Sequence, residues 1–167
     1  LLGTLEIKPQ GNKPKKGEPG TFGADDVLKS FELFRTRYND QEVHIDYNEF
    51  VKARMFDLLV GDWSKHEDNW KWAEYDDNGI KSIRPIPRDR DNVFSRMDGL
   101  IPFLGSRRWA IANMENFGYN KPDIQSLTWQ ARHMDRMLLS SLSREDYREQ
   151  AKIIQATLTD EVLSSAL

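Results

Sequence analysis

Apolar residues recur at helical spacing in the first half of the chain. From Asp46 to about residue 60, the apolar side chains fall near one side of a predicted helix, and Gly61 follows as a C-terminal stop. Asp46 and Glu49 have the spacing of a capping box. We expect an earlier helix that is capped by Asp25 or Asp26. Its apolar face would carry Val27, Phe31 and Phe34.

The last third of the chain is also predicted to be helical. Pro122 suits the first turn of a helix, and an apolar stripe with helical spacing follows it. Ser143 is expected to cap the next helix, and Thr159 a short terminal helix. The two stripes consist of Ile124, Leu127, Ala131, Met134 and Leu138, and of Tyr147, Ala151, Ile154 and Leu158.

The centre of the chain predicts a β-hairpin. Residues 70–75 alternate bulky and charged side chains, and residues 81–86 form the returning strand, whose pairing two prolines limit. Asn78-Gly79 between them is a favoured hairpin turn. The predicted fold is therefore α+β and mostly α, with one central β-hairpin. Residues 1–24 are predicted to be a linker or flexible segment, and residues 25–167 a single domain.

Composition restricts the classes of function. The chain has 167 residues, of which 31% are charged and 38% hydrophobic, as expected for one globular domain. The net charge of -3 gives no basic field, so we expect no nucleic-acid partner. No apolar run is long enough to span a bilayer, so we expect no direct membrane insertion. The absence of cysteine excludes disulfides and thiolate zinc sites.

The N-terminal residue is leucine, and no signal peptide is visible. We therefore expect the chain to be a processed or excised piece of a larger protein. Its expected partners are neighbouring domains of that parent.

The segment with candidate chemistry runs from Gly61 to Asp91. Phosphoryl transfer needs a carboxylate that orients the attacking hydroxyl, and oxygen ligands for the magnesium ions that bridge the phosphates. Here a helix is followed by a loop ending at Asn69, then by the hairpin, and then by Asp89-Arg90-Asp91. The 20 residues from Asn69 to Asp89 suffice for two strands of about six residues and a turn.

Lys65-His66 followed by Asn69 resembles the Asp-Arg-His-x-x-Asn loop of the phosphatidylinositol kinases and related atypical kinases. The resemblance implies a helical domain like an isolated kinase C-lobe, with Mg²⁺ and ATP or another nucleotide as cofactors. It also implies that Asn69 is a metal ligand, that His66 organises the loop, and that Asp89 or Asp91 is the second metal ligand. The residues assigned to metal binding are therefore Asn69, Asp89 and Asp91. We also assign Lys65 and Arg88 to cofactor binding, since arginine can bind phosphate in forked geometry, and Asp62 and His66 to catalysis.

The loop departs from that family's pattern at one position. Ser64 stands where the family has its catalytic aspartate, and serine cannot act as a carboxylate base. Either Asp62 replaces that aspartate in a remodelled loop, or the domain has lost turnover. No glycine-rich phosphate loop after a strand precedes Asp46. The sequence leaves open whether the chain is an enzyme, and we expect no appreciable kinase activity from it alone.

A second resemblance runs from about Asp46 to Leu167. The segments ARMFDLLVGDW (53–63), HEDNWKW (66–72) and PIPRDRD (85–91), with the ends 143–146 and 158–162, look like a region of large Bacteroidetes envelope proteins. In those proteins the region lies between a calcineurin-like metallophosphoesterase domain and an outer-membrane β-barrel. This resemblance implies an extracytoplasmic location, in the periplasm or associated with the outer membrane.

Three interpretations therefore compete. The chain is a kinase-like domain that binds metal and nucleotide, active or degenerate; or a structural and interaction module without ligand; or an accessory domain of a neighbouring metallophosphoesterase. Individual residues also have plainer explanations. Residues 89–91 fit an exposed charged turn, and the tryptophans at 63, 70 and 72 fit core anchors better than a nucleobase platform. Asp57, inside an apolar helix face, either pairs with Arg54 or Arg88 or points into the site.

Overall fold

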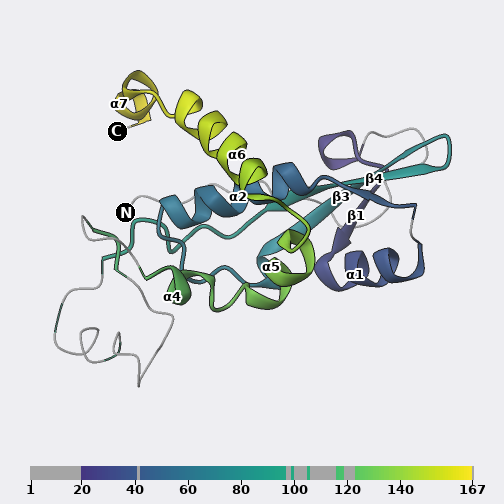
Figure 1. The fold of residues 1–167 in the computed structure, drawn as a ribbon, viewed down its shortest axis with the longest axis horizontal. Helices are drawn as coiled ribbons and strands as arrows, with labels where there is room; N and C mark the ends of the chain where they lie inside the picture. The colour runs from purple at the N-terminus through teal and green to yellow at the C-terminus, as the bar shows by residue number, and fades with distance from the viewer. Residues whose placement is uncertain are drawn as a thin grey trace.

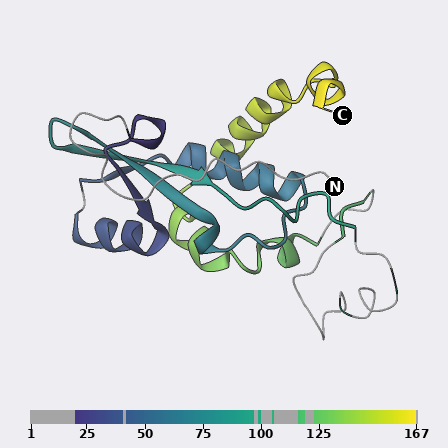
Figure 2. The same ribbon diagram turned by 180° about the vertical axis from the view of Figure 1, so that it is seen from behind.

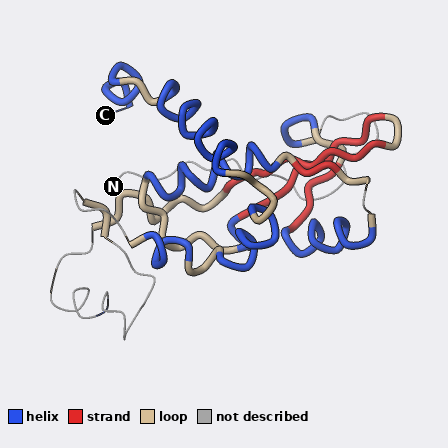
Figure 3. Tube along the Cα trace, in the orientation of Figure 1, coloured by secondary structure: helices blue, strands red, loops and turns tan. Residues whose placement is uncertain are grey.

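The computed structural model describes residues 20–40, 42–96, 99, 105, 116–118 and 123–166. Most of the predicted linker, residues 1–19, and the helix start predicted at Pro122 lie outside the described residues. The helices and strands (Figure 3) are β1 Asp26–Lys29, α1 Ser30–Asn39, β2 His44–Ile45, α2 Tyr47–Leu59, β3 Trp70–Asp77, β4 Ile80–Pro87, α4 Ile124–Thr128, α5 Arg132–Leu139, α6 Arg144–Thr157 and α7 Asp160–Ala166, with 3-10 turns at Thr21–Gly23 and Glu67–Asn69.

The strands form one four-stranded mixed sheet in the order β1-β3-β4-β2. β3 pairs antiparallel with both β1 and β4, whereas β2 runs parallel to β4. The fold is α+β, but the predicted mostly helical, kinase C-lobe-like domain with one hairpin is wrong. The two flanking strands have four and two residues, which is too short for a readable alternation of apolar and polar side chains. Pairing with the hairpin creates them.

The helix predicted from Asp25 or Asp26 starts later than expected. Val27 lies in β1 and is buried against Ala73 of β3, and α1 begins only at Ser30. Phe31, which was expected on the buried helix face, is 76% exposed. Val27 forms part of a strand rather than a helix because its segment pairs with the backbone of β3 and its side chain packs against the buried Ala73.

The predicted hairpin is confirmed and is longer than expected. β3 and β4 each have eight residues and pair from Trp70 with Pro87 to Asp77 with Ile80. Asn78 and Gly79 form the turn with φ values of 54° and 90°. Two consecutive positive φ values are what a primed hairpin turn requires, and asparagine and glycine accept them most readily.

Local signals at both ends of α2 are confirmed. The Asp46 carboxylate accepts a hydrogen bond from the backbone N–H of Glu49 at 2.9 Å, which caps the N-terminus. Gly61 has a φ of 72°, and the N–H of Asp62 donates to the carbonyl of Asp57 at 2.8 Å. This is the hydrogen bond of a Schellman C-cap. It fixes the direction in which the chain enters the loop at 61–69.

The C-terminal helices follow the predicted caps. Ser143 accepts from the N–H of Asp146 at the start of α6, and Thr159 accepts from the N–H of Val162 at the start of α7. The stripe predicted as one helix from residue 124 is divided into α4 and α5. Four of its five residues are still buried: Leu127, Ala131, Met134 and Leu138.

The core lies where α1, α2 and α5 pack against the sheet. Phe50 of α2 contacts Trp70 and Trp72 of β3, with ring centroids 4.9 and 5.5 Å apart. Trp70 and Trp72 are 1% and 0% exposed, which confirms that they are core anchors. The hairpin tip and α7 lie at opposite ends of the molecule (Figures 1 and 2). No helix among the described residues is long and apolar enough to cross a membrane.

Candidate functional site

The open end of the hairpin brings two predicted site residues together. Asn69 directly precedes β3, and Asp89 follows two residues after the end of β4. The N–H of Arg88 donates to the carbonyl of Asn69 at 2.9 Å, which extends the strand pairing by one step. Beyond it, Nδ2 of Asn69 donates to Oδ2 of Asp89 at 2.7 Å. The register of the hairpin therefore places these side chains in contact, and their metal-binding role stays a prediction.

His66 and Asn69 brace the 3-10 turn at the end of the loop. The N–H of His66 donates to Oδ1 of Asn69 at 3.1 Å, and Nδ1 of His66 accepts from the N–H of Asp68 at 3.3 Å. Ser30, at the start of α1, donates to the carbonyl of Glu67 at 2.6 Å and ties the same turn to the core. The His66 side chain is 45% exposed, so it organises the loop while one face stays open to solvent.

Asp89 holds an unusual backbone conformation with an exposed side chain. Its φ is 55°, in the left-handed region that residues other than glycine rarely adopt. Such conformations cost free energy and cluster at functional sites. Asp91 is also exposed, and its Oδ1 accepts from Nδ2 of Asn92 at 2.8 Å. Asn92 also donates to Oγ of Ser64 at 2.9 Å, which links the acidic turn to the loop.

Below this surface lies a buried cluster of charges. Asp57, Asp62 and Lys65 are each fully buried. Nζ of Lys65 is 3.4 Å from Oδ2 of Asp62 and 4.0 Å from Oδ1 of Asp57, and it donates to the carbonyl of Arg88. Nε of Arg90 donates to Oδ1 of Asp57 at 3.0 Å. Lys65 therefore joins the end of α2 to the turn after β4.

A buried arginine extends the cluster to α5. Nε and Nη2 of Arg54 donate to the two carboxylate oxygens of Asp135 at 2.8 and 2.9 Å, in a bidentate pair. Nη1 of Arg54 lies 3.4 Å from Oδ2 of Asp57. With Lys65 and Arg90, the cluster holds three cations against the three carboxylates of Asp57, Asp62 and Asp135. The charges balance.

Burial shifts the ionisation of the central pair in opposite directions. Desolvation lowers the pKa of Lys65 below its ordinary value, although the charges of Asp57 and Asp62 oppose the shift. Desolvation raises the pKa of Asp57, although Lys65, Arg90 and Arg54 oppose it. Each charge in this cluster therefore depends on its neighbours.

Asp62, a predicted catalytic residue, has no access to solvent. Its Oδ1 accepts from the N–H and Oγ of Ser64 at 3.3 and 3.1 Å. Its Oδ2 lies beside Lys65 but has no hydrogen-bond partner among the described residues. In this arrangement Asp62 acts on the loop through Ser64 and Lys65, and a direct base role would require the loop to move. Lys65, predicted to bind a cofactor, is likewise fully committed to buried partners.

Sequence reasoning named the unusual Asp57 and one of its partners, Arg54, but not Arg90 or Lys65. It offered Arg54 or Arg88, and the structure pairs Asp57 with Arg54 and Arg90. Arg88, the residue directly after β4, instead binds through its backbone: its carbonyl accepts from Nζ of Lys65, and its N–H donates to the carbonyl of Asn69. Its side chain is half-buried. Asp135 is 81 residues from Arg54, and nothing local in the sequence connects them.

Oxygen ligands for a cation are present but few. Among the described residues, no group of three or more histidine, aspartate or glutamate side chains is arranged to hold a metal ion. Asp89 supplies a carboxylate, and Asn69 turns Nδ2 of its amide towards it while Oδ1 accepts from the N–H of His66. Mg²⁺ keeps several waters and is commonly held by one or two carboxylates together with substrate phosphates. The residues fit a shared ion of that type rather than a metal held by protein ligands alone.

Comparison of the chain with family models, with curated proteins and with solved structures finds no match. The kinase-like loop, the envelope-protein relationship, the extracytoplasmic location and the expected partner domains therefore stay predictions.

Proposed function

We propose that the loop at 61–69 and the turn at 88–91 bind the phosphate groups of a nucleotide through Mg²⁺. The observation that carries this proposal is the 2.7 Å contact between Asn69 and Asp89 at the open end of the hairpin. It places the Asn69 amide, through Nδ2, against the carboxylate of Asp89, which lies 20 residues further along the chain and is exposed. The φ of 55° at Asp89 sets the direction of its carboxylate at the end of the hairpin, and aspartate is among the residues that adopt this conformation most readily after glycine.

The protein alone would hold the ion weakly. Asp89 provides a carboxylate ligand, and Asn69 would provide Oδ1 by giving up its bond with the N–H of His66. Asp91 lies two residues further along the exposed turn, and water and phosphate oxygens would supply the rest. Lys65 and the buried carboxylates support this surface from beneath by fixing the backbone of Arg88. We therefore expect the metal and the nucleotide to bind more tightly together than either does alone.

The proposed domain does not transfer phosphate by itself. Ser64 stands where the orienting carboxylate is expected, and its hydroxyl is already bonded to Asp62 and Asn92. Loss of an orienting general base costs on the order of a hundredfold or more in rate. Incubation with labelled ATP, Mg²⁺ and a generic protein acceptor should show no appreciable transfer by the wild type. Robust wild-type transfer that Asp62→Ala abolishes would contradict this prediction and would make Asp62 the base.

One observation favours a second candidate, a structural module without ligand. Both polar atoms of the Asn69 amide are already used, since Oδ1 accepts from His66 and Nδ2 donates to Asp89. A pair of hydrogen bonds that uses both polar atoms of the amide can hold the open end of a hairpin together without any cation. The two candidates differ in what the negative charge of Asp89 does.

Asp89→Asn separates the two candidates. Asparagine accepts positive φ at least as readily as aspartate and keeps a carbonyl oxygen for the Asn69 bond, so the variant removes only the charge. We would measure Mn²⁺ binding by electron paramagnetic resonance, with and without a non-hydrolysable ATP analogue. Asp68→Ala is the matched control, because its carboxylate lies one residue from Asn69 and is 93% exposed.

The cation proposal predicts that Asp89→Asn loses most Mn²⁺ binding while Asp68→Ala binds like the wild type. Indistinguishable binding by the wild type and Asp89→Asn would count against the site. If the wild type binds no Mn²⁺ in the presence of the analogue and Asn69→Ala lowers stability, the structural module is the better description.

A further inference from the structure

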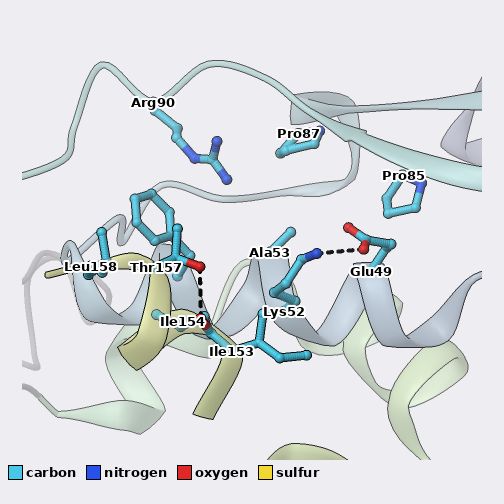
Figure 4. Close-up of a pocket in the computed structure, with 11 residues that line it drawn as sticks. Glu49, Lys52, Ala53, Pro85, Pro87, Arg90, Ile153, Ile154, Thr157 and Leu158 are labelled. Carbon is cyan, nitrogen blue, oxygen red and sulfur yellow. Dashed lines mark hydrogen bonds and ion pairs between the residues drawn. The ribbon is translucent and has the colours of Figure 1, made fainter. Parts of the chain in front are cut away.

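A pocket of about 350 Å³ lies between α2, the end of β4 and α6, and neither Asn69 nor Asp89 is among the residues that line it (Figure 4). Its walls are mainly apolar. Ala53 and Phe56 contribute from α2, Ile154 from α6, Leu158 from the position directly after α6, and Pro87 from the end of β4. Pockets for small molecules are typically of this size or larger, with apolar walls and a few polar groups that orient the ligand.

The polar groups of the pocket are unequal. Lys52 and Glu49 form an ion pair along one turn of α2, so their charges offset each other at the rim. Oγ1 of Thr157 donates to the carbonyl of Ile153 within α6. Both contacts appear as dashed lines in Figure 4. Neither pair offers an uncommitted charge to a ligand.

Arg90 is different. Its Nε donates to Asp57, and its guanidinium lies over the ring of Phe56 with 5.2 Å to the ring centroid. The remaining guanidinium nitrogens have no carboxylate partner among the described residues, and the side chain is 33% exposed. Figure 4 shows the guanidinium directed from the loop after β4 towards the pocket. One hydrogen bond and one cation–π contact hold the guanidinium in place, and its outer N–H groups have no carboxylate partner in the part of the chain that the structure describes.

We propose that this pocket binds a small amphipathic carboxylate, with its apolar body between α2 and α6 and its carboxylate on Arg90. The guanidinium fork matches the two oxygens of a carboxylate, and the charge-assisted bonds strengthen where apolar walls exclude water. Arg90 would repel a cationic ligand. A neutral apolar ligand would leave the outer N–H groups of the guanidinium without an acceptor, while Nε stays bonded to Asp57. Arg90 belongs to the turn at 88–91, but the proposed cation ligands Asn69, Asp89 and Asp91 are not among the residues that line the pocket.

The test uses a matched pair of probes. 4-Butylbenzoate and 4-butylbenzamide have nearly the same shape, but only the first carries a charge. Binding is followed by chemical shifts in ¹H–¹⁵N correlation spectra of the whole chain. We expect saturable binding of the benzoate, with chemical-shift changes at residues of α2 and α6. The amide should bind at least about tenfold more weakly, because it lacks the charge-assisted pair with Arg90.

Two variants and one control complete the test. Arg90→Met should weaken the benzoate to the level of the amide and leave the amide unchanged. Ile154→Trp keeps Arg90 but fills the pocket, so it should abolish binding of both probes even if Arg90→Met proves unstable. Arg148→Met, an exposed arginine of α6 outside the pocket lining, should change neither affinity.

Equal affinity of the two probes would overturn the carboxylate specificity. Failure of the benzoate to saturate, or retention of binding in Ile154→Trp, would overturn the pocket itself. A pocket filled by a second copy of the chain would exclude both probes, and that result would also refute the proposal.

Discussion

Replacing Lys65 with methionine tests the buried charge cluster directly. The ammonium is fully buried, lies 3.4 and 4.0 Å from two fully buried carboxylates, and donates to the carbonyl of Arg88. Methionine fills similar space but leaves Asp62 without a cation beside it. Removing one partner of a buried ion pair costs about 3–5 kcal/mol, because the remaining charge stays desolvated. We expect a loss of stability in that range.

The assay is urea unfolding at constant pH, followed by far-UV circular dichroism. Tryptophan fluorescence alone is ambiguous because Nζ of Lys65 lies 5.5 Å from the ring centroid of Trp70. An unchanged slope with denaturant shows that the midpoint shift reports stability. Lys52→Met is the control, since that lysine is a partly exposed member of an α2 surface pair. It should change stability by about 0.5 kcal/mol or less.

A second substitution restores the charge balance. Asp62→Asn alone leaves Lys65 with one carboxylate fewer, whereas Lys65→Met with Asp62→Asn removes one charge of each sign. The double variant should recover part of the loss, with a coupling energy of about 1–3 kcal/mol. Strict additivity, or a loss below about 1 kcal/mol for Lys65→Met, would refute the argument that these charges depend on each other.

The pH dependence of Lys65→Met follows from the same contacts. The wild-type pKa of Asp57 is already raised by burial, and loss of the ammonium raises it further. A carboxyl group with a raised folded-state pKa stabilises the fold below its unfolded pKa, and that stabilisation is lost as pH rises through the folded value. The deficit of the variant should therefore be smaller near about pH 5 than near about pH 8. A deficit that is equal at both values would contradict this assignment.

Three further substitutions test local features by shifts in the urea or thermal midpoint. Gly79→Ala should destabilise by about 1 kcal/mol or more, because the turn holds this residue at a φ of 90°; no change would exclude the primed turn. Ser143→Ala should cost about 1 kcal/mol, since its hydroxyl caps α6 through the N–H of Asp146, and an unaltered midpoint would contradict that role. Ser64→Asp should lower stability more at alkaline than at mildly acidic pH, because it places a second carboxylate where Oγ is 3.1 Å from Asp62; a pH-independent effect would argue against that repulsion.

Short-range features of this protein could be predicted from the sequence. The Asn78-Gly79 turn, the Asp46 cap and the Gly61 stop all depend on residues within four or five positions of one another. Their free energies are decided by backbone conformation and nearby hydrogen bonds, which the residue types set directly. The contact between Asn69 and Asp89 could also be anticipated, although it spans 20 residues. Both residues adjoin the open end of one hairpin, and the register of its strands sets their positions.

The wider sheet and the charge network were decided only by the tertiary structure. β1 and β2 form because β3 and β4 offer them backbone partners, and an isolated segment of two to four residues carries no signal of its own. Asp57 pairs with Arg90 because the turn after β4 brings that side chain against α2, where it also lies over the ring of Phe56. Arg54 reaches Asp135 across 81 residues. The sequence by itself determined the local turns and caps, whereas long-range packing selected the partners of each buried charge, because the cost of burying a charge depends on every group that the fold brings around it.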